Sequence, residues 1–455
     1  MFARQSLKKM NASGAQCKRI TVGLPWGAQT AVAVACLVSA SFVHAQSLAA
    51  LYEAAKAYDA TFLSAQTQFG ANQAKAEQAR AGLLPIAALT ADAFLNNRDS
   101  SANALDSSFN NQTLKLAGNQ PLYRPGNKIS FEQAQKSLEI AQAQLQAAEQ
   151  DLIVRTAQAY FDVLASEDNL TFVKAQKSAV SEQLAAAKRN FEVGTSTITD
   201  TREAQARFDL VNAQEIAAEN EARVKKLALA QLVGKADAQP ARLVPGTAIP
   251  VITPDNVEAW VNQSESTHPA IKQAQAALEI AQLEVQKAQA AQGPTVDLVG
   301  QYQIARAPSG SQAIPGYVRN NVASVGVQFN LPLYTGGAVQ NRVKEALLLE
   351  EKARTDLDAV KRSLAQATRT AFFGVSSGMG QIKALEAAES SSQSALDANK
   401  LGYQVGVRIN IDVLNAQSQL YQTKASLAKA RYDVLVGGLK LRQAAGALKF
   451  IDLPQ

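Results

Sequence analysis

The chain has 455 residues, including 45 Lys or Arg, 39 Asp or Glu, two Cys and two His. Five basic residues and no acid precede position 46, so residues 46–455 hold 40 basic and 39 acidic side chains, a net charge of +1. This balance removes the main argument for a protein that binds nucleic acid, and none is expected as a partner. A hydrophobic content of 47% excludes a largely disordered chain.

Residues 1–45 are typical of a secretory signal peptide. A basic segment is followed by an apolar run over 28–43, and Val43-His44-Ala45 has the small-residue pattern expected before a cleavage site. An alternative is a lipid anchor on Cys36, but Ala33 stands where a lipidation signal usually has Leu. No later apolar run approaches 18 residues, so we expect an exported chain without a transmembrane helix.

Two short motifs resemble enzyme signatures, and neither has its context. Gly374-Val-Ser-Ser-Gly378 matches the nucleophile elbow, but it lies inside a predicted helix and His268 is the only histidine after position 45. Ser426-Leu-Ala-Lys429 lacks the companion motifs of its enzyme class. With no cysteine after the leader, a zinc or iron–sulfur site has almost no ligands. We therefore expect no enzyme, no metal and no cofactor.

The chain after the leader is an internal duplication. Phe191-Glu-Val-Gly-Thr-Ser-Thr-Ile-Thr-Asp200 resembles Tyr403-Gln-Val-Gly-Val-Arg-Ile-Asn-Ile-Asp412, and further matches continue at the same offset. The sequence therefore predicts two structural repeats of one plan, over 46–245 and 246–455.

Each repeat is predicted to contain one very long helix flanked by shorter ones. The 67 residues between Gly126 and Gly194 include no Gly or Pro and are rich in helix formers. At 1.5 Å per residue they would form a rod of roughly 100 Å. We expect a weak or bent point in the second rod, and a linker that belongs to a belt around the rods. The weak or bent point is expected at Gly374, Gly378 and Gly380, and the linker is 235–254. The predicted helices are 47–82, 126–194, 200–234, 255–292, 338–402 and 412–446.

Each repeat also has a pair of segments in which apolar residues alternate with period two. They lie at about 84–97, 110–123, 294–306 and 318–334. Each is long enough for a tilted strand to cross a bilayer. A soluble sheet with one wet face is the alternative. The export signal and the duplication favour a barrel wall, and because four strands cannot close a barrel the chain must then form an oligomer with 8, 12 or 16 strands.

These features together resemble the TolC family of outer-membrane channel-tunnels of Gram-negative bacteria. The most specific stretch is Tyr403–Gln417 with its counterpart from Phe191. The resemblance implies a mixed α+β membrane protein: a homotrimer whose 12-stranded barrel in outer-membrane lipid continues into a periplasmic α-helical tunnel. It also implies a periplasmic adaptor and an inner-membrane ABC, RND or MFS transporter as partners, and an exit duct for drugs, small molecules or secreted proteins.

The two hairpin turns, at about 191–199 and 403–411, are the predicted functional tips. Glycines there supply the backbone that ends a long helix. Asp200 is predicted to open the next helix, forming a capping-box-like pair with Glu203, and Asp412 to open the corresponding helix. By the resemblance, the following residues have roles in the channel. The latch that holds the tunnel closed would consist of Thr199, Asp200, Tyr403 and Arg408. The acidic ring at the constriction would be formed by Asp412. The turns that dock the adaptor would contain Val193, Gly194, Val405 and Gly406.

One departure from the family pattern is Asn415, where close relatives carry a second acid. A trimer would then present three carboxylates rather than six, with weaker attraction for cations. Two non-enzyme alternatives are a periplasmic adaptor, which usually has one hairpin, and a coiled-coil scaffold, which would leave the strands unused. Type I protein secretion and RND or MFS efflux are not separated by the sequence.

Overall fold

The computed structural model describes residues 46–98, 107–242, 252–308 and 316–452. The predicted signal peptide with Cys36, and residues 243–251 of the predicted linker, lie outside the described residues. Gln46–Gln455 separate from the first 45 residues as one compact unit.

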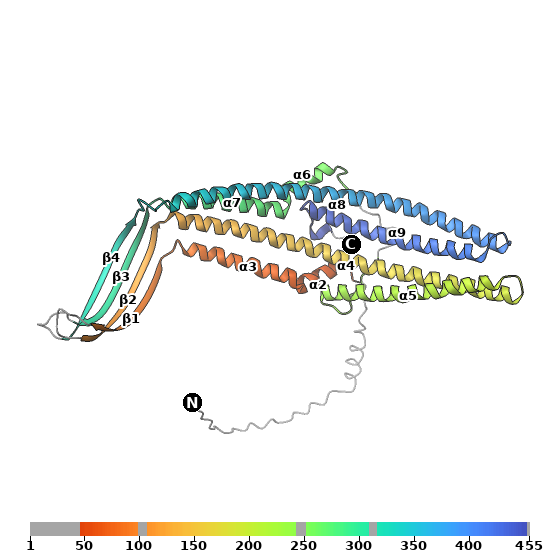
Figure 1. Cartoon of the computed structure of the whole chain (residues 1–455), viewed down its shortest axis with the longest axis horizontal. Coiled ribbons are helices and arrows are strands. Elements are labelled where there is room, and N and C mark those ends of the chain that lie inside the picture. Colours follow the sequence, from red (N-terminus) through yellow and green to blue (C-terminus); the bar gives the residue numbers. More distant parts are fainter. Residues whose placement is uncertain (1–45, 99–106, 243–251, 309–315, 453–455) are drawn as a thin grey trace, which may run out of the picture. The chain divides into compact units, whose positions relative to one another are not determined.

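The alternating segments form one antiparallel sheet in the order β1-β2-β3-β4. Its strands are β1 (Ile86–Arg98), β2 (Ser107–Tyr123), β3 (Thr295–Pro308) and β4 (Tyr317–Asn330). β2 of the first repeat pairs directly with β3 of the second, so both repeats contribute to one curved sheet (Figure 1). The last strand ends at Asn330 rather than 334, since Pro332 has no N–H to donate and Gly336 and Gly337 turn the chain at φ 62° and 82°.

Two long helical hairpins extend from one end of this sheet (Figure 1). The first joins α4 (Pro125–Glu192) to α5 (Ile198–Val233), and the second joins α8 (Ala338–Gln404) to α9 (Asn410–Ala444). The strand pairs and long hairpins predicted for both repeats are thus confirmed. None of the helices in the described part of the chain is long and apolar enough to cross a membrane.

The shorter helices that precede the strands are each split in two, where one continuous helix was predicted over 47–82 and another over 255–292. The first pair is α2 (Leu48–Tyr58) and α3 (Ala60–Ala81); the second is α6 (Val257–Thr267) and α7 (Pro269–Ala290). Asp59 caps α3 by accepting a hydrogen bond from Phe62 N at 2.8 Å. His268 caps α7 in the same way, with Nδ1 accepting from Ala270 N at 3.1 Å and Pro269 in the first turn.

α8 is helical throughout, including the three glycines at which a weak or bent point was predicted, and that point stays a prediction. Two glycines allow α8 and α9 to approach closely. A Cβ on Gly378 would lie 2.6 Å from Cγ2 of Val434, and one on Gly437 would lie 3.1 Å from Cγ2 of Val375. The absent side chains leave room for two valines of the facing helix.

The main core surrounds the middle of α4, where α2, α5 and α9 pack against it. Tyr52, Phe161, Leu164 and Leu229 are at most 1% exposed there. At the sheet end, Arg124 donates two hydrogen bonds to Asp297, at 2.7 and 2.6 Å, and so fixes the start of α4 against β3. A bidentate pair of this kind is geometrically specific, so the junction between sheet and helices is well defined.

Candidate functional site

The two hairpin tips have the same backbone structure. Both long helices end in a glycine with left-handed backbone, Gly194 at φ 79° and Gly406 at φ 80°. In the first tip Thr195 N donates to Asn190 O at 2.8 Å, and in the second Val407 N donates to Gly402 O at 2.8 Å. These are the 6→1 bonds of a Schellman motif, which satisfies the last carbonyls of a helix. Each glycine is therefore required by the turn.

The first tip contains a capping box, but its residues differ from the predicted ones. The N-cap of α5 is Thr197, and Asp200 is the third residue of the helix rather than its cap. Thr197 Oγ1 accepts from Asp200 N at 3.2 Å, and Asp200 Oδ2 accepts from Thr197 N at 3.0 Å. The predicted pairing of Asp200 with Glu203 is wrong, because the threonine three residues earlier already fills the cap. The backbone N–H of Thr197 lowers the pKa of Asp200.

The second tip lacks a side-chain cap. The N-cap of α9 is Ile409, so Asp412 is the third residue of α9 and does not open it as predicted. Asp412 instead forms an ion pair with Arg408, whose Nη1 lies 3.6 Å from Asp412 Oδ2. The stem of Arg408 crosses Gly402, where a Cβ would lie 2.7 Å from Arg408 Cγ. Two residues with predicted gate roles are thus adjacent in one protomer.

Polar side chains join the two hairpins near their tips, and sequence reasoning missed most of them. Asn190 Nδ2 donates to Tyr403 Oη at 3.2 Å. The side chain of Asn410, 1% exposed, hydrogen-bonds with Gln183 and donates to Asp200 O at 3.4 Å. Asn residues are common along these helices, so no local pattern marks the ones that reach across. The one signal that could have marked Asn410 is the alignment of the two repeats, in which this polar residue stands opposite the apolar Ile198.

Asn415 also bridges the hairpins. Its Oδ1 accepts a hydrogen bond from Arg207 Nη2 of α5 at 2.5 Å. The amide at this position is therefore held by the other hairpin. An aspartate would make a charge-assisted bond with the same arginine.

The four predicted latch residues are not brought together within one protomer. Asp200 bonds to Ser196 and Thr197 of its own turn. Tyr403 bonds to Asn190 and Arg408 to Asp412, while Thr199 is exposed in the first turn of α5. Their roles as a latch therefore stay predictions.

The tips expose apolar side chains to solvent. Val193 is 73% exposed in the first tip, and Val405, Val407 and Ile409 are 65%, 79% and 60% exposed in the second. Large apolar residues gathered on an exposed turn are typical of a contact surface for another protein. Gly194 follows Val193, and Gly406 lies between Val405 and Val407; both glycines set the shape of their turns.

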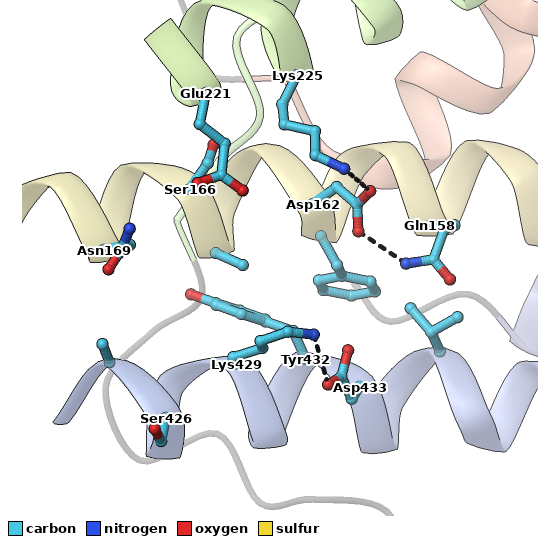
Figure 2. Close-up of a pocket in the computed structure, with 14 residues that line it drawn as sticks. Gln158, Asp162, Ser166, Asn169, Glu221, Lys225, Ser426, Lys429, Tyr432 and Asp433 are labelled. Carbon is cyan, nitrogen blue, oxygen red and sulfur yellow. Dashed lines mark hydrogen bonds and ion pairs between the residues drawn. The ribbon is translucent and has the colours of Figure 1, made fainter. Parts of the chain in front are cut away.

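A second feature is a cleft of about 330 Å³ midway along the hairpins, between α4, α5 and α9 (Figure 2). Asp162 lies in its wall, accepting from Lys225 Nζ at 2.7 Å and from Gln158 Nε2 at 2.7 Å. Tyr432 Oη donates to Asp168 at 2.7 Å, and burial, followed by this carboxylate, raises the pKa of the phenol. Two ion pairs, Lys225 with Asp162 and Lys429 with Asp433, lie in the wall, so the cleft has the character of a packing interface. No cluster of His, Cys, Asp or Glu suited to a metal occurs within the described residues.

The outer helices of the protomer expose apolar surface along their length. On α5, Ile216 and Leu227 are 63% and 64% exposed, and on α8, Leu348 and Phe373 are 65% and 58% exposed. In the sheet, every residue of β4 is exposed. β1 and β4 each pair on one side only, so the sheet has two open edges.

Comparison with known proteins identifies the architecture. A family model described as "Outer membrane efflux protein" matches residues 51–235 and 260–447. The chain belongs to this family. It is 34% identical over 416 residues to the outer membrane protein TolC of Vibrio cholerae, covering 91% of this chain and 93% of that protein. It is also 31% identical over 351 residues to the alkaline protease secretion protein AprF of Pseudomonas aeruginosa, covering 76% and 72%.

The solved structures agree on the fold. The outer membrane protein VceC of Vibrio cholerae superposes with a TM-score of 0.74 at 22% identity, covering 88% of this chain and 96% of that one. The resemblance to the TolC family is confirmed, and with it the absence of enzymatic function. This outer membrane efflux protein is a channel in the outer membrane of a Gram-negative bacterium, and it works as a trimer with export machinery. The adaptor and scaffold alternatives are wrong.

Proposed function

We propose that three copies of this chain close one 12-stranded barrel above a single helical tunnel, and that this duct receives cargo from an inner-membrane transporter through a periplasmic adaptor. The open edges of β1 and β4 support the closure, because an unpaired edge is not tolerated in lipid. The exposed apolar residues of α5 and α8 support the tunnel, since a head-to-tail ring would place α8 of one protomer against α5 of the next.

The observation that carries the adaptor contact is the exposed apolar tip. Val193, Val405 and Val407 are 73%, 65% and 79% exposed, on turns held rigid by their backbone bonds. A preformed turn loses little conformational entropy on docking, so such residues suit a protein partner. We assign the adaptor to these turns, with Gly194 and Gly406 fixing their shape.

The adaptor contact can be tested by cross-linking, because residues 46–455 contain no cysteine. Val407→Cys carries a photo-crosslinker in cells, and Asp358→Cys, on an exposed position of α8, is the matched control. We expect the tip variant alone to capture a periplasmic adaptor, identified by mass spectrometry. Equal capture at both positions, or efficient labelling without any adaptor, would contradict docking at the tip.

The same experiment identifies the cargo class. An adaptor that belongs to an ABC exporter would indicate secreted proteins, as in the relative AprF, which is named for alkaline protease secretion. An adaptor of an RND or MFS pump would indicate drugs or other small molecules. The channel needs no substrate chemistry of its own when an inner-membrane partner selects the cargo.

We place the gate at the second tip. Three Asp412 carboxylates would form the constriction ring, each paired with Arg408, whose guanidinium is 59% exposed and would have donors left for a neighbouring protomer. Thr199, Asp200 and Tyr403 would complete the latch between hairpins. Opening is then a population shift, in which the docked partner favours the splayed helices by more than these contacts favour the closed ones.

The gate is tested by recording single trimers in a lipid bilayer. Asp412→Asn should weaken cation preference and block by divalent ions, and Arg408→Ser should raise the open probability. Asp209→Asn removes an exposed carboxylate from α5 outside the tip and serves as control. If Asp412→Asn and the control behave alike, the ring assignment is wrong; an unaltered open probability in Arg408→Ser counts against the latch.

A further inference from the structure

Two arginines face each other at the end of the sheet farthest from the helices. Arg306 of β3 and Arg319 of β4 are direct cross-strand partners in the antiparallel register. They lie near the end of β3 and the start of β4, at the end of the sheet opposite the long hairpins (Figure 1). Side chains paired in this way project from the same face of the sheet.

That face is the apolar one. Along β3 it carries Leu298, Tyr302 and Ile304, and along β4 it carries Ala323, Val325 and Val327. The opposite face carries polar residues. They include Asp92, Thr90, Lys115, Gln303 and Ser324. In an outer-membrane barrel the apolar face is in contact with lipid and the polar face lines the lumen, so both arginines project outward.

Their height matches the boundary of the membrane. Val296 and Arg306, on the same face of β3, are ten residues apart, which is about 33 Å along the strand at 3.3 Å per residue. For a strand tilted by about 40° this is a height of about 25 Å. The apolar band of such barrels is about 25 Å tall. Since the helices extend on the periplasmic side, the arginines lie at the head-group level of the outer leaflet.

The pair has no acid to neutralise it on the four strands. These strands contain two acids, Asp92 and Asp297. Asp92 is on the lumen face, and Asp297 is bound to Arg124 at the other end of the sheet. Like charges directly opposite each other on a sheet are destabilising, so the arrangement calls for an anion from outside the strands.

The neighbouring residues hold one arginine in place. The guanidinium carbon of Arg306 lies 5.1 Å from the ring centroid of Tyr317, a cation–π contact. Tyr317 is fixed in turn, because its Oη accepts a hydrogen bond from Asn110 N at 3.0 Å. Gln112 is the cross-strand partner of Arg306 on β2 and adds an amide on the same face.

We propose that Arg306 and Arg319 bind a phosphate group of lipopolysaccharide in the outer leaflet. Guanidinium groups bind phosphate oxygens in bidentate geometry, and two of them facing each other can share one phosphate dianion. The lipid A part of lipopolysaccharide carries phosphates at the head-group level and acyl chains that would cover the apolar face beside the pair. Tyr317 sits at the interface between the two, where aromatic residues of barrels gather.

The test uses the purified trimer in detergent, titrated with diphosphoryl lipid A and analysed by native mass spectrometry. Arg306→Gln and Arg319→Gln should each weaken binding about tenfold, the effect of losing one charge-assisted contact, and the double variant should weaken it further. The control, Lys115→Gln with Lys128→Gln, removes two positive charges from the lumen face and from α4. It should bind lipid A as the unmodified protein does.

Two further probes test the role of the phosphate group on the unmodified trimer. Dephosphorylated lipid A should bind the unmodified trimer about tenfold more weakly than the diphosphoryl form. Inorganic phosphate should displace lipid A only at far higher concentration. Equal binding of both lipid forms, equal loss in the control variant, or equally effective competition by inorganic phosphate would overturn the proposal. Arg306→Lys with Arg319→Lys keeps the charge and should bind between the unmodified protein and the double Gln variant.

Discussion

The two hairpins began as copies, and they differ most at one level, midway between sheet and tip. In the first hairpin Asp162 of α4 binds Lys225 of α5 at 2.7 Å. The aligned positions in the second hairpin are Gly374 and Gly437. The first pair of helices is therefore joined by charge, whereas in the second a valine takes the space of a missing side chain. A Cβ on Gly437 would lie 3.1 Å from Cγ2 of Val375, and nothing lies within 4 Å of one on Gly374. Both solutions hold two helices together, but only the second depends on the absence of side chains.

Burial differs between the long helices as well. α4 has 17 buried residues and α8 has seven. Phe161 of α4 is 1% exposed, whereas the aligned Phe373 of α8 is 58% exposed. α4 is packed between α3, α5, α7 and α9, while α8 lies at the edge of the protomer (Figure 1). The same sequence pattern thus builds the core of a protomer in one repeat and, we infer, the contact between protomers in the other.

The largest expected effect comes from truncating the two aligned phenylalanines. Phe161→Ala removes a ring from the core and should destabilise the protomer by about 3–5 kcal/mol. Phe373→Ala should change the folding of the protomer little and lower the temperature at which the trimer dissociates. Circular dichroism on heating and trimer loss on unboiled SDS gels separate the two effects. Equal unfolding in both variants would show that the exposed ring is not an intermolecular contact.

The glycines of the second hairpin give the next effect. Gly378→Val would place atoms against Val434, 2.6 Å from the new Cβ, and should cost about 1–3 kcal/mol by overpacking. Gly380→Ala has nothing within 4 Å of its Cβ and should stabilise the helix by up to about 1 kcal/mol. Heat-induced loss of helicity measures both.

A transplanted pair sharpens this result. The first repeat has Ser166 and Ala222 where the second has Gly378 and Val434. Gly378→Ser alone should destabilise, and Gly378→Ser with Val434→Ala should recover most of the loss. Without such recovery, the steric account of the glycine is incorrect.

The sequence predicted the repeats, the strand pairs and the long hairpins because each of these follows from a long periodic pattern. It missed the break at Asp59, since good helix formers continue on both sides and a capping side chain looks like any surface polar residue. At His268 the sequence does contain a helix-start signal, because Pro269 follows directly, but the prediction of one helix over 255–292 did not use it. It assigned Asp200 to the wrong cap position because several Ser and Thr precede it. The contacts of Asn190 and Asn410 could not be predicted, because they depend on how two hairpins far apart in sequence lie together.

The two breaks should respond differently to pH. Burial lowers the pKa of His268, so the fold favours the neutral ring whose Nδ1 caps α7. As pH falls below about 6.5, the unfolded state takes up the proton first and stability is lost. The hydrogen bonds from Arg155 lower the pKa of Asp59, so its contribution persists above the usual carboxyl pKa and is lost only at more acidic pH.

Hydrogen exchange between about pH 7.5 and 5.5, corrected for the intrinsic rate, checks this difference. Protection should fall at the α6–α7 junction and remain at the α2–α3 junction. His268→Asn supplies a cap that does not titrate and should remove the change. Equal loss of protection at both junctions would mean that another group controls the acid response.

The smallest effect concerns the ion pair with which the comparison began. Lys225→Met keeps the apolar stem and removes the charge, leaving Asp162 with Gln158 as its partner. The two side chains are 37% and 31% exposed, so solvent screens the pair and the loss should be about 0.5–1 kcal/mol. Lys429→Met, which breaks an exposed pair with Asp433 one turn away on the same helix, should lose about half as much.

Asp162→Asn combined with Lys225→Met should destabilise less than the two single changes added together, because the second change removes a partner that is already gone. Additive losses in heat-induced unfolding would mean that charge does not hold the first hairpin together at this level, and that its helices, like those of the second, depend on packing alone.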